Sequence, residues 1–394
     1  MFTLSNIFKR GANYIFIVVL ARAISVYDFG IYSVYANILG ILILVTNFGF
    51  SEYLLVNSNN KKLKQNNLNA FLFFSFSLFL ILFSGLLILN LENTTLAILI
   101  LFKIFFDTTV YNILLSYFQV EKRLLEITRT NFFLATLLIS ASLYFYFNKT
   151  GVYSLFSTVL AINTIIFSVL FYKTKFTSIS LKKALHFVKE KFSELKFYGI
   201  STITVPIYMM SPTVIASFIL NPETLAQYQV AFSIANILLL ISVSQLQERY
   251  SSFLSSQESI WVLANKIKKT GFRIMIINIS VLIFFIIFGK YILLLIYNKE
   301  EYLAAFPLLI TLLVSNVIFM VASVAATLMV VLKMQKEKSK YHLEFTFLSI
   351  FIGALMTYYY GSFGLTLSYT LLYSYSAIRY SLKFKAIINK QLNN

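Results

Sequence analysis

Residues 21–52 read ARAISVYDFGIYSVYANILGILILVTNFGFSE, in which a short polar turn joins the end of one apolar segment to the start of the next. A similar arrangement returns 196 residues later. This offset places Tyr32 on Tyr228 and Gly30 on Ala226. Because 196 is almost half of the 394 residues, the match indicates two related halves.

The composition identifies the broad class of protein. Hydrophobic residues make up 59% of the chain and charged residues 12%, whereas a soluble domain has about 45–50% apolar and about 25% charged residues. The chain is therefore expected to be a membrane protein. Its net charge of +18 comes from basic residues in short stretches between apolar segments, which favours membrane topology over a nucleic-acid partner.

The chain contains no cysteine, so disulfides, thiolate metal sites and cysteine nucleophiles are excluded. Both histidines, His186 and His342, lie beside basic loops, and no metal site is predicted. The sequence also lacks a substantial loop segment with paired carboxylates, so we predict no catalytic residues and no enzymatic activity.

Apolar segments of membrane-spanning length predict an all-α integral membrane protein with about twelve transmembrane helices, six per half. Each segment can cross a hydrocarbon core of about 30 Å. The predicted spans are 7–24, 31–55, 68–90, 95–118, 129–148, 152–173, 197–220, 225–248, 272–297, 303–332, 342–360 and 363–387. An even number of spans per half means that both halves enter from the same side, as parallel repeats.

Lysine and arginine set the predicted orientation. With both termini in the cytoplasm, most of the 33 basic residues lie on the inner side, as the positive-inside rule requires. The exceptions are Lys103, within a span, and four residues on the outer side: Arg22, Lys149, Lys290 and Lys299.

Three parts of the chain follow from this topology: an N-terminal lobe over 1–173, a basic cytoplasmic linker over 174–196 and a C-terminal lobe over 197–394. The linker is expected to be an amphipathic helix on the anionic inner leaflet. Its apolar positions recur at helical spacing at Leu181, Leu185, Val188 and Phe192.

Lys103 and Asp107 are four residues apart within one predicted span, so they share a helical face. Two charges at that depth cost roughly 2.5–3.5 kcal/mol each, and a mutual pair is the usual solution. One interpretation is a permanent ion pair that lines a wet cavity. The other makes Lys103 a phosphate contact when Asp107 is protonated.

The predicted seventh span contains Pro206 and Pro212, although the whole chain has four prolines. A proline removes a backbone hydrogen bond and can bend a helix. This segment could act as a gate, or it could be a static kink that improves packing.

The segments AR, YDFGIY and NFGF, at residues 21–22, 27–32 and 47–50, resemble the start of bacterial polysaccharide flippases of the O-antigen type. These belong to the multidrug/oligosaccharidyl-lipid/polysaccharide exporter superfamily. NPE and YQVA, at 221–223 and 228–231, resemble the family's turn between spans seven and eight, although Ala226 stands where a glycine is usual. Span count and topology agree over the whole chain, but specific residues match only at these two turns.

The resemblance implies a MATE-like fold in the bacterial inner membrane. It also implies movement of an undecaprenyl-pyrophosphate-linked oligosaccharide, an O-antigen or capsule repeat unit, from the inner to the outer leaflet by alternating access. A polysaccharide polymerase and a chain-length regulator are candidate partners. No cofactor is expected, although coupling to H⁺ or Na⁺ would suit such a transporter.

Arg22 and Lys103 are the candidate ligands of the pyrophosphate, because a guanidinium can hold a phosphate through two parallel hydrogen bonds. Arg22 could instead extend to the membrane interface or pair with Asp28. Polar residues within spans could contact the sugars, and the candidates are Asn37, Tyr228, Gln229 and Asn236.

A drug or cation exporter of the same fold is the alternative function. Such an exporter would need acidic residues in the cavity of the first lobe, and Asp107 alone fits that requirement.

Overall fold

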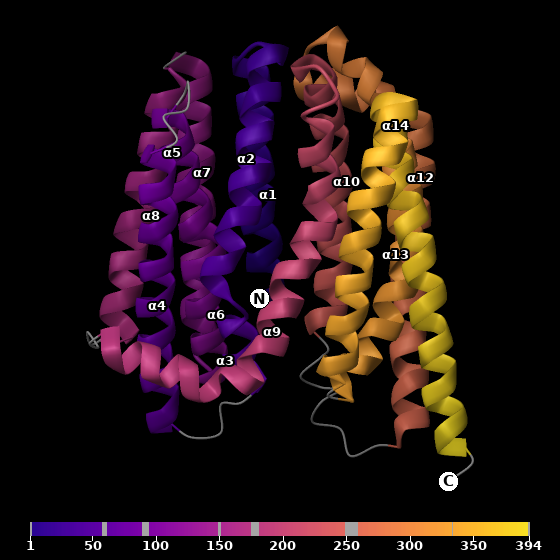
Figure 1. The fold of residues 1–394 in the computed structure, drawn as a ribbon. Coiled ribbons are helices and arrows are strands. Elements are labelled where there is room, and N and C mark those ends of the chain that lie inside the picture. Colours follow the sequence, from indigo (N-terminus) through magenta and orange to yellow (C-terminus); the bar gives the residue numbers. More distant parts are fainter. Residues whose placement is uncertain are drawn as a thin grey trace. The chain divides into compact units, whose positions relative to one another are not determined.

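The computed structural model describes residues 2–56, 61–88, 94–148, 151–174, 181–248, 259–332 and 334–392, and these are almost entirely helical (Figure 1). Ten helices among them are long and apolar enough to cross a membrane. Two further spans follow from the structure: α1 (Phe2–Ala23), whose three basic residues lower its hydropathy, and the second half of the last helix. The predicted all-α membrane fold with about twelve spans is confirmed.

The chain forms two compact units. Unit 1 consists of Met1–Ala23 and Val34–Met210, and unit 2 of Ile24–Ser33 and Ser211–Asn394. The division of the chain at 173 and 196 stays a prediction. Residues 175–180 of the predicted linker, and Lys149, lie outside the described residues.

Most of the helices follow the predicted spans, with interruptions in the second and fourth spans and with α9 (Leu181–Ala216) joining part of the predicted linker to the seventh span. From the first half they are α1, α2 (Val26–Asn47), α3 (Phe50–Val56), α4 (Lys61–Ile88), α5 (Thr94–Ile104), the π-helix η1 (Phe105–Val110), α6 (Tyr111–Val120), α7 (Leu124–Asn148), α8 (Val152–Thr174) and α9 (Leu181–Ala216). The second half contains α10 (Pro222–Glu248), α12 (Ile260–Tyr297), the 3-10 helix η2 (Glu300–Ala304), α13 (Ala305–Val331) and α14 (Gln335–Leu392).

The repeat found in the sequence also appears in the local structure, because α2 and α10 begin 196 residues apart. The Ser25 hydroxyl accepts the Asp28 backbone N–H at 3.0 Å, and the Asn221 side-chain oxygen accepts the Thr224 N–H at 2.9 Å. Both are N-caps, which satisfy amide groups that a helix start leaves without partners. The two turns therefore use the same capping device at matching positions.

Replacing either cap, Ser25→Ala or Asn221→Ala, is expected to lower the free energy of unfolding by about 1 kcal/mol, because an N–H of the first turn loses its acceptor. Thermal unfolding of the purified protein in one detergent measures the loss. Ser140→Ala, on an exposed position within α7, is the matched control. A control that loses as much stability as the two cap variants would contradict the capping role.

The predicted span over 31–55 is wrong in its boundaries, because the helix breaks after Asn47. Phe48 and Gly49 have φ angles of 38° and 74°, in the left-handed region that ends a helix. A Cβ atom on Gly49 would lie 2.5 Å from the carbonyl carbon of Tyr198 and 2.6 Å from the amide nitrogen of Gly199. Glycine is therefore required where α9 passes the end of α2.

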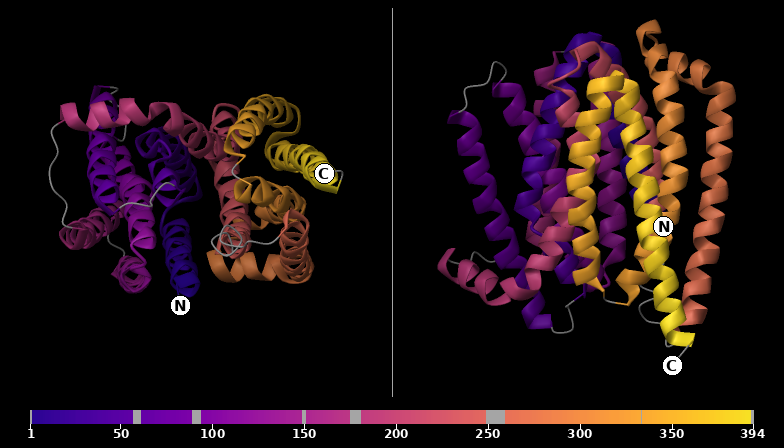
Figure 2. Two further views of the ribbon diagram at one scale, coloured as in Figure 1. Left: turned by 90° about the horizontal axis from the view of Figure 1, so that it is seen from below. Right: turned by 45° about the vertical axis from the view of Figure 1, so that its right-hand side comes forward.

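The first part of α9 lies across the ends of neighbouring unit 1 helices (Figures 1 and 2). Its Phe187 ring packs 5.7 Å from Phe71, and its Glu194 carboxylate accepts a 3.2 Å hydrogen bond from Tyr53. Burial and the Glu194 carboxylate raise the pKa of Tyr53 to about 12. Val188 is buried whereas Leu185 is exposed. Only part of the predicted apolar stripe is therefore available to contact the lipid leaflet.

Unit 2 is built around α13, which packs against α10, α12 and α14. Its buried face carries Leu309, Leu312, Met320 and Leu328. Gly361, with φ of 59° and ψ of −141°, interrupts α14 and separates the last two spans. The predicted boundary between these spans, at residues 360–363, is confirmed.

Candidate functional site: a polar pocket within unit 1

The fourth span contains a π-helix. η1 interrupts the α-helix between α5 and α6, and Asp107 lies within it. This segment packs against two other helices. Thr109 shares a buried 2.7 Å hydrogen bond with Thr46 of α2, and the Phe105 ring stacks 4.2 Å from the Phe79 ring of α4. Such π segments inside α-helices occur frequently at functional sites.

Asp107 is bound from two helices. The Lys103 ammonium contacts its Oδ2 at 2.8 Å, and the Asn163 amide of α8 donates to its Oδ1 at 3.3 Å. The Lys103 and Asp107 side chains are only 14% and 19% exposed. The ion pair that their spacing predicts therefore forms, and it lies largely within the protein.

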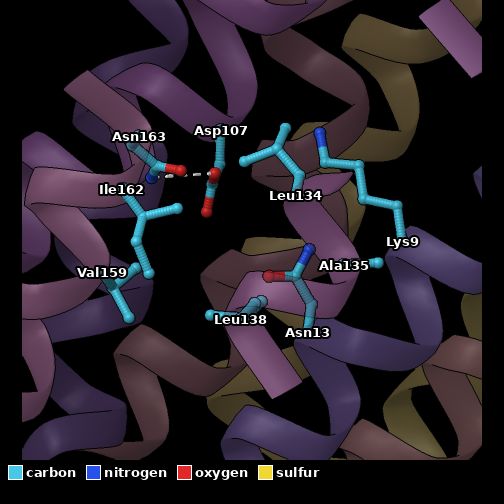
Figure 3. A pocket seen from close by; sticks show the side chains of 9 residues that line it. All are labelled: Lys9, Asn13, Asp107, Leu134, Ala135, Leu138, Val159, Ile162 and Asn163. Carbon is cyan, nitrogen blue, oxygen red and sulfur yellow. Dashed lines mark hydrogen bonds between the residues drawn. The ribbon is translucent and has the colours of Figure 1, made fainter. Parts of the chain in front are cut away.

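Asp107 lines a small pocket within unit 1 (Figure 3). Lys9 and Asn13 of α1 lie on one side of it, and Asp107 and Asn163 on the other. Apolar residues of α7 and α8 complete the wall: Leu134, Ala135, Leu138, Val159 and Ile162. Polar groups from three helices thus face a space with apolar sides.

A chain of polar contacts places Lys9. Its Nζ lies 2.8 Å from the centre of the Tyr111 ring, a cation–π contact. The Tyr111 hydroxyl donates to Asn131 of α7 at 2.6 Å, and the Asn131 amide donates back to Asn6 of α1 at 2.8 Å. The position of Lys9 is therefore set by α6 and α7 as well as by its own helix.

Basic side chains outnumber acidic ones in the neighbourhood of the pocket. Lys103 and Arg10 act on Lys9 electrostatically, as does Asp107. Three basic side chains and one carboxylate thus lie near one another, in a region where desolvated charges interact strongly. Ionisable residues at membrane depth mark substrate and ion pathways, and this arrangement suits an anion.

Arg22 does not line this pocket. Its guanidinium lies 5.9 Å from the Tyr146 ring of α7. The Phe16 ring, 5.0 Å from the Lys103 ammonium, is six residues earlier in α1, so Arg22 is about 9 Å further along the helix axis. Asp28 accepts a 2.6 Å hydrogen bond from Ser25 within the capped turn of α2.

The other predicted site residues are distributed over both units. Asn37 is buried in unit 1, and α9 remains helical through Pro206 and Pro212. The Tyr228 hydroxyl is fully buried in unit 2, where it accepts from Thr213 at 3.1 Å and donates to Tyr369 at 3.2 Å. Gln229 and Asn236 are partly buried on α10. Their roles in gating or sugar contact stay predictions.

Sequence reasoning missed Lys9 and Asn13. It counted Lys9 with the basic residues of the inner side, although Lys9, Asn13 and Phe16 follow at spacings of four and three and so share one face of α1. That spacing was the available signal. The spacing places these residues on one face of α1, but which helix that face contacts is known only from the packing of α1.

Comparison with known proteins adds the family and the fold. The family described as polysaccharide biosynthesis protein matches residues 1–248. A comparison with curated proteins gave no match.

Among solved structures, the chain is similar to the lipid II flippase MurJ in an inward closed conformation, with a TM-score of 0.74 and 16% identity over 98% of this chain and 87% of that one. An inward-facing multidrug resistance MATE family transporter of the MOP superfamily gives a TM-score of 0.67 and 14% identity, over 100% of this chain and 96% of that one. A MOP superfamily transporter from Pyrococcus furiosus gives 0.58 and 13%, over 98% and 94%. At these identities the likeness shows the fold, and the predicted MATE-like architecture is confirmed.

Proposed function

The chain belongs to the family of polysaccharide biosynthesis proteins, and on that premise we propose that it is a flippase for an undecaprenyl-pyrophosphate-linked oligosaccharide. The cargo would be an O-antigen or capsule repeat unit, moved from the inner to the outer leaflet of the bacterial inner membrane. The observation that carries this proposal is the excess of basic side chains near the pocket of unit 1, where Lys9, Lys103 and Arg10 lie near a single carboxylate, that of Asp107. Both termini lie in the cytoplasm in this proposal, as the distribution of lysine and arginine predicts.

A pyrophosphate head group cannot cross the hydrocarbon core unaided, because each desolvated charge costs several kcal/mol. Lys9 and Lys103 supply ammonium groups inside unit 1, each beside an aromatic ring. Arg22, further along α1, offers a bidentate phosphate contact on the same route. We assign the head group to Lys9 and Lys103, with Arg22 as the next contact along α1.

Alternating access is the proposed mechanism. The head group and its sugars enter a cationic cavity open to the cytoplasm, while the polyprenyl tail stays in the lipid. A change of conformation then exposes the head group to the outside, with bending of α9 at Pro206 and Pro212 as the proposed gate. Movement in one direction requires that the two conformations bind the head group with different affinities. The product would pass to a polysaccharide polymerase and a chain-length regulator.

Export of an organic cation is the second candidate function. The observation that favours it is the carboxylate of Asp107 at membrane depth, in a fold shared with multidrug transporters. The Lys103 ammonium forms an ion pair with that carboxylate at 2.8 Å, and Lys9 lines the same pocket. Both lysines would repel a cation. The charge balance of the pocket therefore favours the flippase.

Transport of lipid-linked oligosaccharide in cells that lack their own flippase tests the proposal. Lys9→Gln is expected to lower transport about 10-fold or more at matched membrane abundance, because a charge-assisted hydrogen bond contributes about 1.5–3 kcal/mol. Lys290→Gln is the matched control, since this exposed lysine of α12 also lies beside a ring, 5.5 Å from Phe306.

Three outcomes separate the candidates. Loss of transport in Lys9→Gln but not in Lys290→Gln supports the flippase and its head-group site. Equal transport by both variants would remove Lys9 from the site. A wild type that restores no lipid-linked oligosaccharide transport but lowers the cellular accumulation of a cationic dye would favour the exporter.

A further inference from the structure

We propose that the inner end of α12 binds the head groups of anionic phospholipids of the inner leaflet through a stripe of basic side chains. The stripe consists of Lys266, Lys269 and Arg273, and Lys268 lies beside it. This surface belongs to unit 2 and contains none of the residues that line the pocket of unit 1. The inference is therefore independent of the proposed function, and either can fail while the other holds.

The three residues of the stripe share one face of the helix, because they follow one another at spacings of three and four. All three side chains are exposed. The same row continues into Ile276 and Ile277, which are exposed although they are apolar. Exposed isoleucines within a membrane-spanning helix contact lipid. The basic side chains therefore lie on the lipid-facing side of α12.

The length of α12 places the stripe at the level of the head groups. The helix has 38 residues and is about 57 Å long, whereas the hydrocarbon core is about 30 Å thick. Lys269 and Lys290 are 21 residues apart, about 32 Å along the axis, so they fit the two boundaries of that core. Lys266 then lies within the inner head-group layer, which is about 5–7 Å thick. Arg273 starts one turn inside the boundary, and its long side chain can extend to the head groups.

Packing of the opposite side holds the inner end of α12 in place. Leu263, Ala264 and Ile267 are buried in a hydrophobic cluster with Leu328 of α13. Partly buried apolar residues from the last turns of α14 pack against this cluster, and the ends of the two helices lie side by side (Figure 1). The stripe is therefore presented on a helix that is fixed within unit 2.

Unit 2 supplies few acidic groups that could neutralise the stripe. The sequence contains no aspartate or glutamate from Ile260 to Lys299, and α13 contains none either. On α14, Glu337 and Glu344 form ion pairs with Lys383 and Arg379. Like charges three and four residues apart on a helix repel each other, and an anion from the surroundings would relieve this repulsion. At this depth, the phosphates of anionic phospholipids are the available anions.

The expected selectivity follows from the charge of the stripe. Each lysine or arginine close to an anionic membrane surface favours the contact about fivefold. Phosphatidylcholine has no net charge and gains no such preference. Salt weakens the attraction, because charges are screened over about 8–10 Å at ordinary ionic strength. Anionic lipids should therefore be enriched around α12 at low salt and lose this enrichment at high salt.

Trp261 gives a local measurement of this enrichment. It is the only tryptophan of the chain, it is exposed, and it precedes Lys266 by five residues. The full-length protein is reconstituted in phosphatidylcholine vesicles with a small fraction of labelled lipid. The labelled lipid is either phosphatidylglycerol or phosphatidylcholine, with the same fluorescent acceptor in its acyl chain. For wild type at low salt, energy transfer from Trp261 to the labelled phosphatidylglycerol should exceed that to the labelled phosphatidylcholine at least about threefold.

Two variants with equal changes in charge locate the effect. The test variant replaces three lysines of α12: Lys266→Gln, Lys268→Gln and Lys269→Gln. The control variant replaces three exposed lysines in the first part of α9: Lys182→Gln, Lys189→Gln and Lys196→Gln. The ratio of the two transfers should fall close to one in the test variant and stay at the wild-type value in the control.

A ratio near one for the wild type would overturn the inference, and this measurement does not depend on the folding of any variant. A wild-type ratio in the test variant would also overturn it, because the stripe would then not hold the lipid. The same conclusion would follow if the control variant lost as much enrichment as the test variant, since net charge alone would then attract the lipid. None of these outcomes bears on transport by the pocket of unit 1.

Discussion

Lys103→Ala is expected to reduce the amount of folded protein in the membrane several-fold, and Asp107→Asn in the same chain to restore it. The single change leaves the Asp107 carboxylate without its cation, and breaking a buried ion pair in this way costs about 3–5 kcal/mol. Because the two side chains are 14% and 19% exposed, we expect the lower end of that range. The double variant has no uncompensated carboxylate, so it should fold while transport remains low.

Abundance in the membrane, followed by gel filtration of a fluorescent fusion, measures the first effect. Lys191→Ala is the matched control, because Lys191 forms a more exposed and longer pair with Glu190, at 3.7 Å. Pairs of that kind contribute about 0–1 kcal/mol. Wild-type abundance of Lys103→Ala would show that Asp107 tolerates the loss of its partner, and would contradict the ion pair as a structural element.

Gly30→Ala is expected to have the second large effect. An added Cβ would lie 2.0 Å from the carbonyl oxygen of Pro222 and 2.6 Å from its carbonyl carbon, within unit 2. These are backbone atoms at the start of α10, so the strain cannot be relieved by a side-chain rotation. Overpacking costs about 1–3 kcal/mol, and the contact with backbone places this change at the upper end.

Thermal unfolding and membrane abundance of Gly30→Ala should both fall relative to wild type. Gly85→Ala in α4 is the control, because no atom lies within 4 Å of an added Cβ there. Alanine is the better helix former by about 1 kcal/mol, so the control should be unchanged or slightly more stable. A Gly30→Ala protein as stable as the control would show that α2 and α10 can separate locally without cost.

The spans and the repeat could be predicted from the sequence because they depend on local properties. Hydropathy and the positions of lysine and arginine do not require knowledge of which helices are neighbours. The contact between Lys103 and Asp107 was also accessible, since residues four apart share a face in any helix. Similarly, Ser25 and Asn221 are recognisable caps because their partners lie only three residues away.

The remainder depends on contacts between distant segments. The break at Phe48 and Gly49 lies in a largely apolar sequence, and its glycine is needed because the backbone at Tyr198 passes close by. Lys9 reaches the pocket because Tyr111 and Asn131 fix its surroundings from α6 and α7. Arg22 and Lys103 were both predicted to bind the pyrophosphate, yet hydropathy does not show how far apart the two side chains lie in the folded protein.

The π-helix at Phe105–Val110 also affects how this span should be aligned with related proteins. Backbone hydrogen bonds join residues five apart in a π-helix and four apart in an α-helix. A π segment within an α-helix therefore contains one extra residue. Each extra residue advances a helix by about 100°, so the faces of α5 and α6 are not in one continuous register. An alignment without a gap against an uninterrupted helix would be correct on one side of this segment and shifted by one residue on the other. Equivalent positions should therefore be assigned separately for residues 94–104 and 111–120.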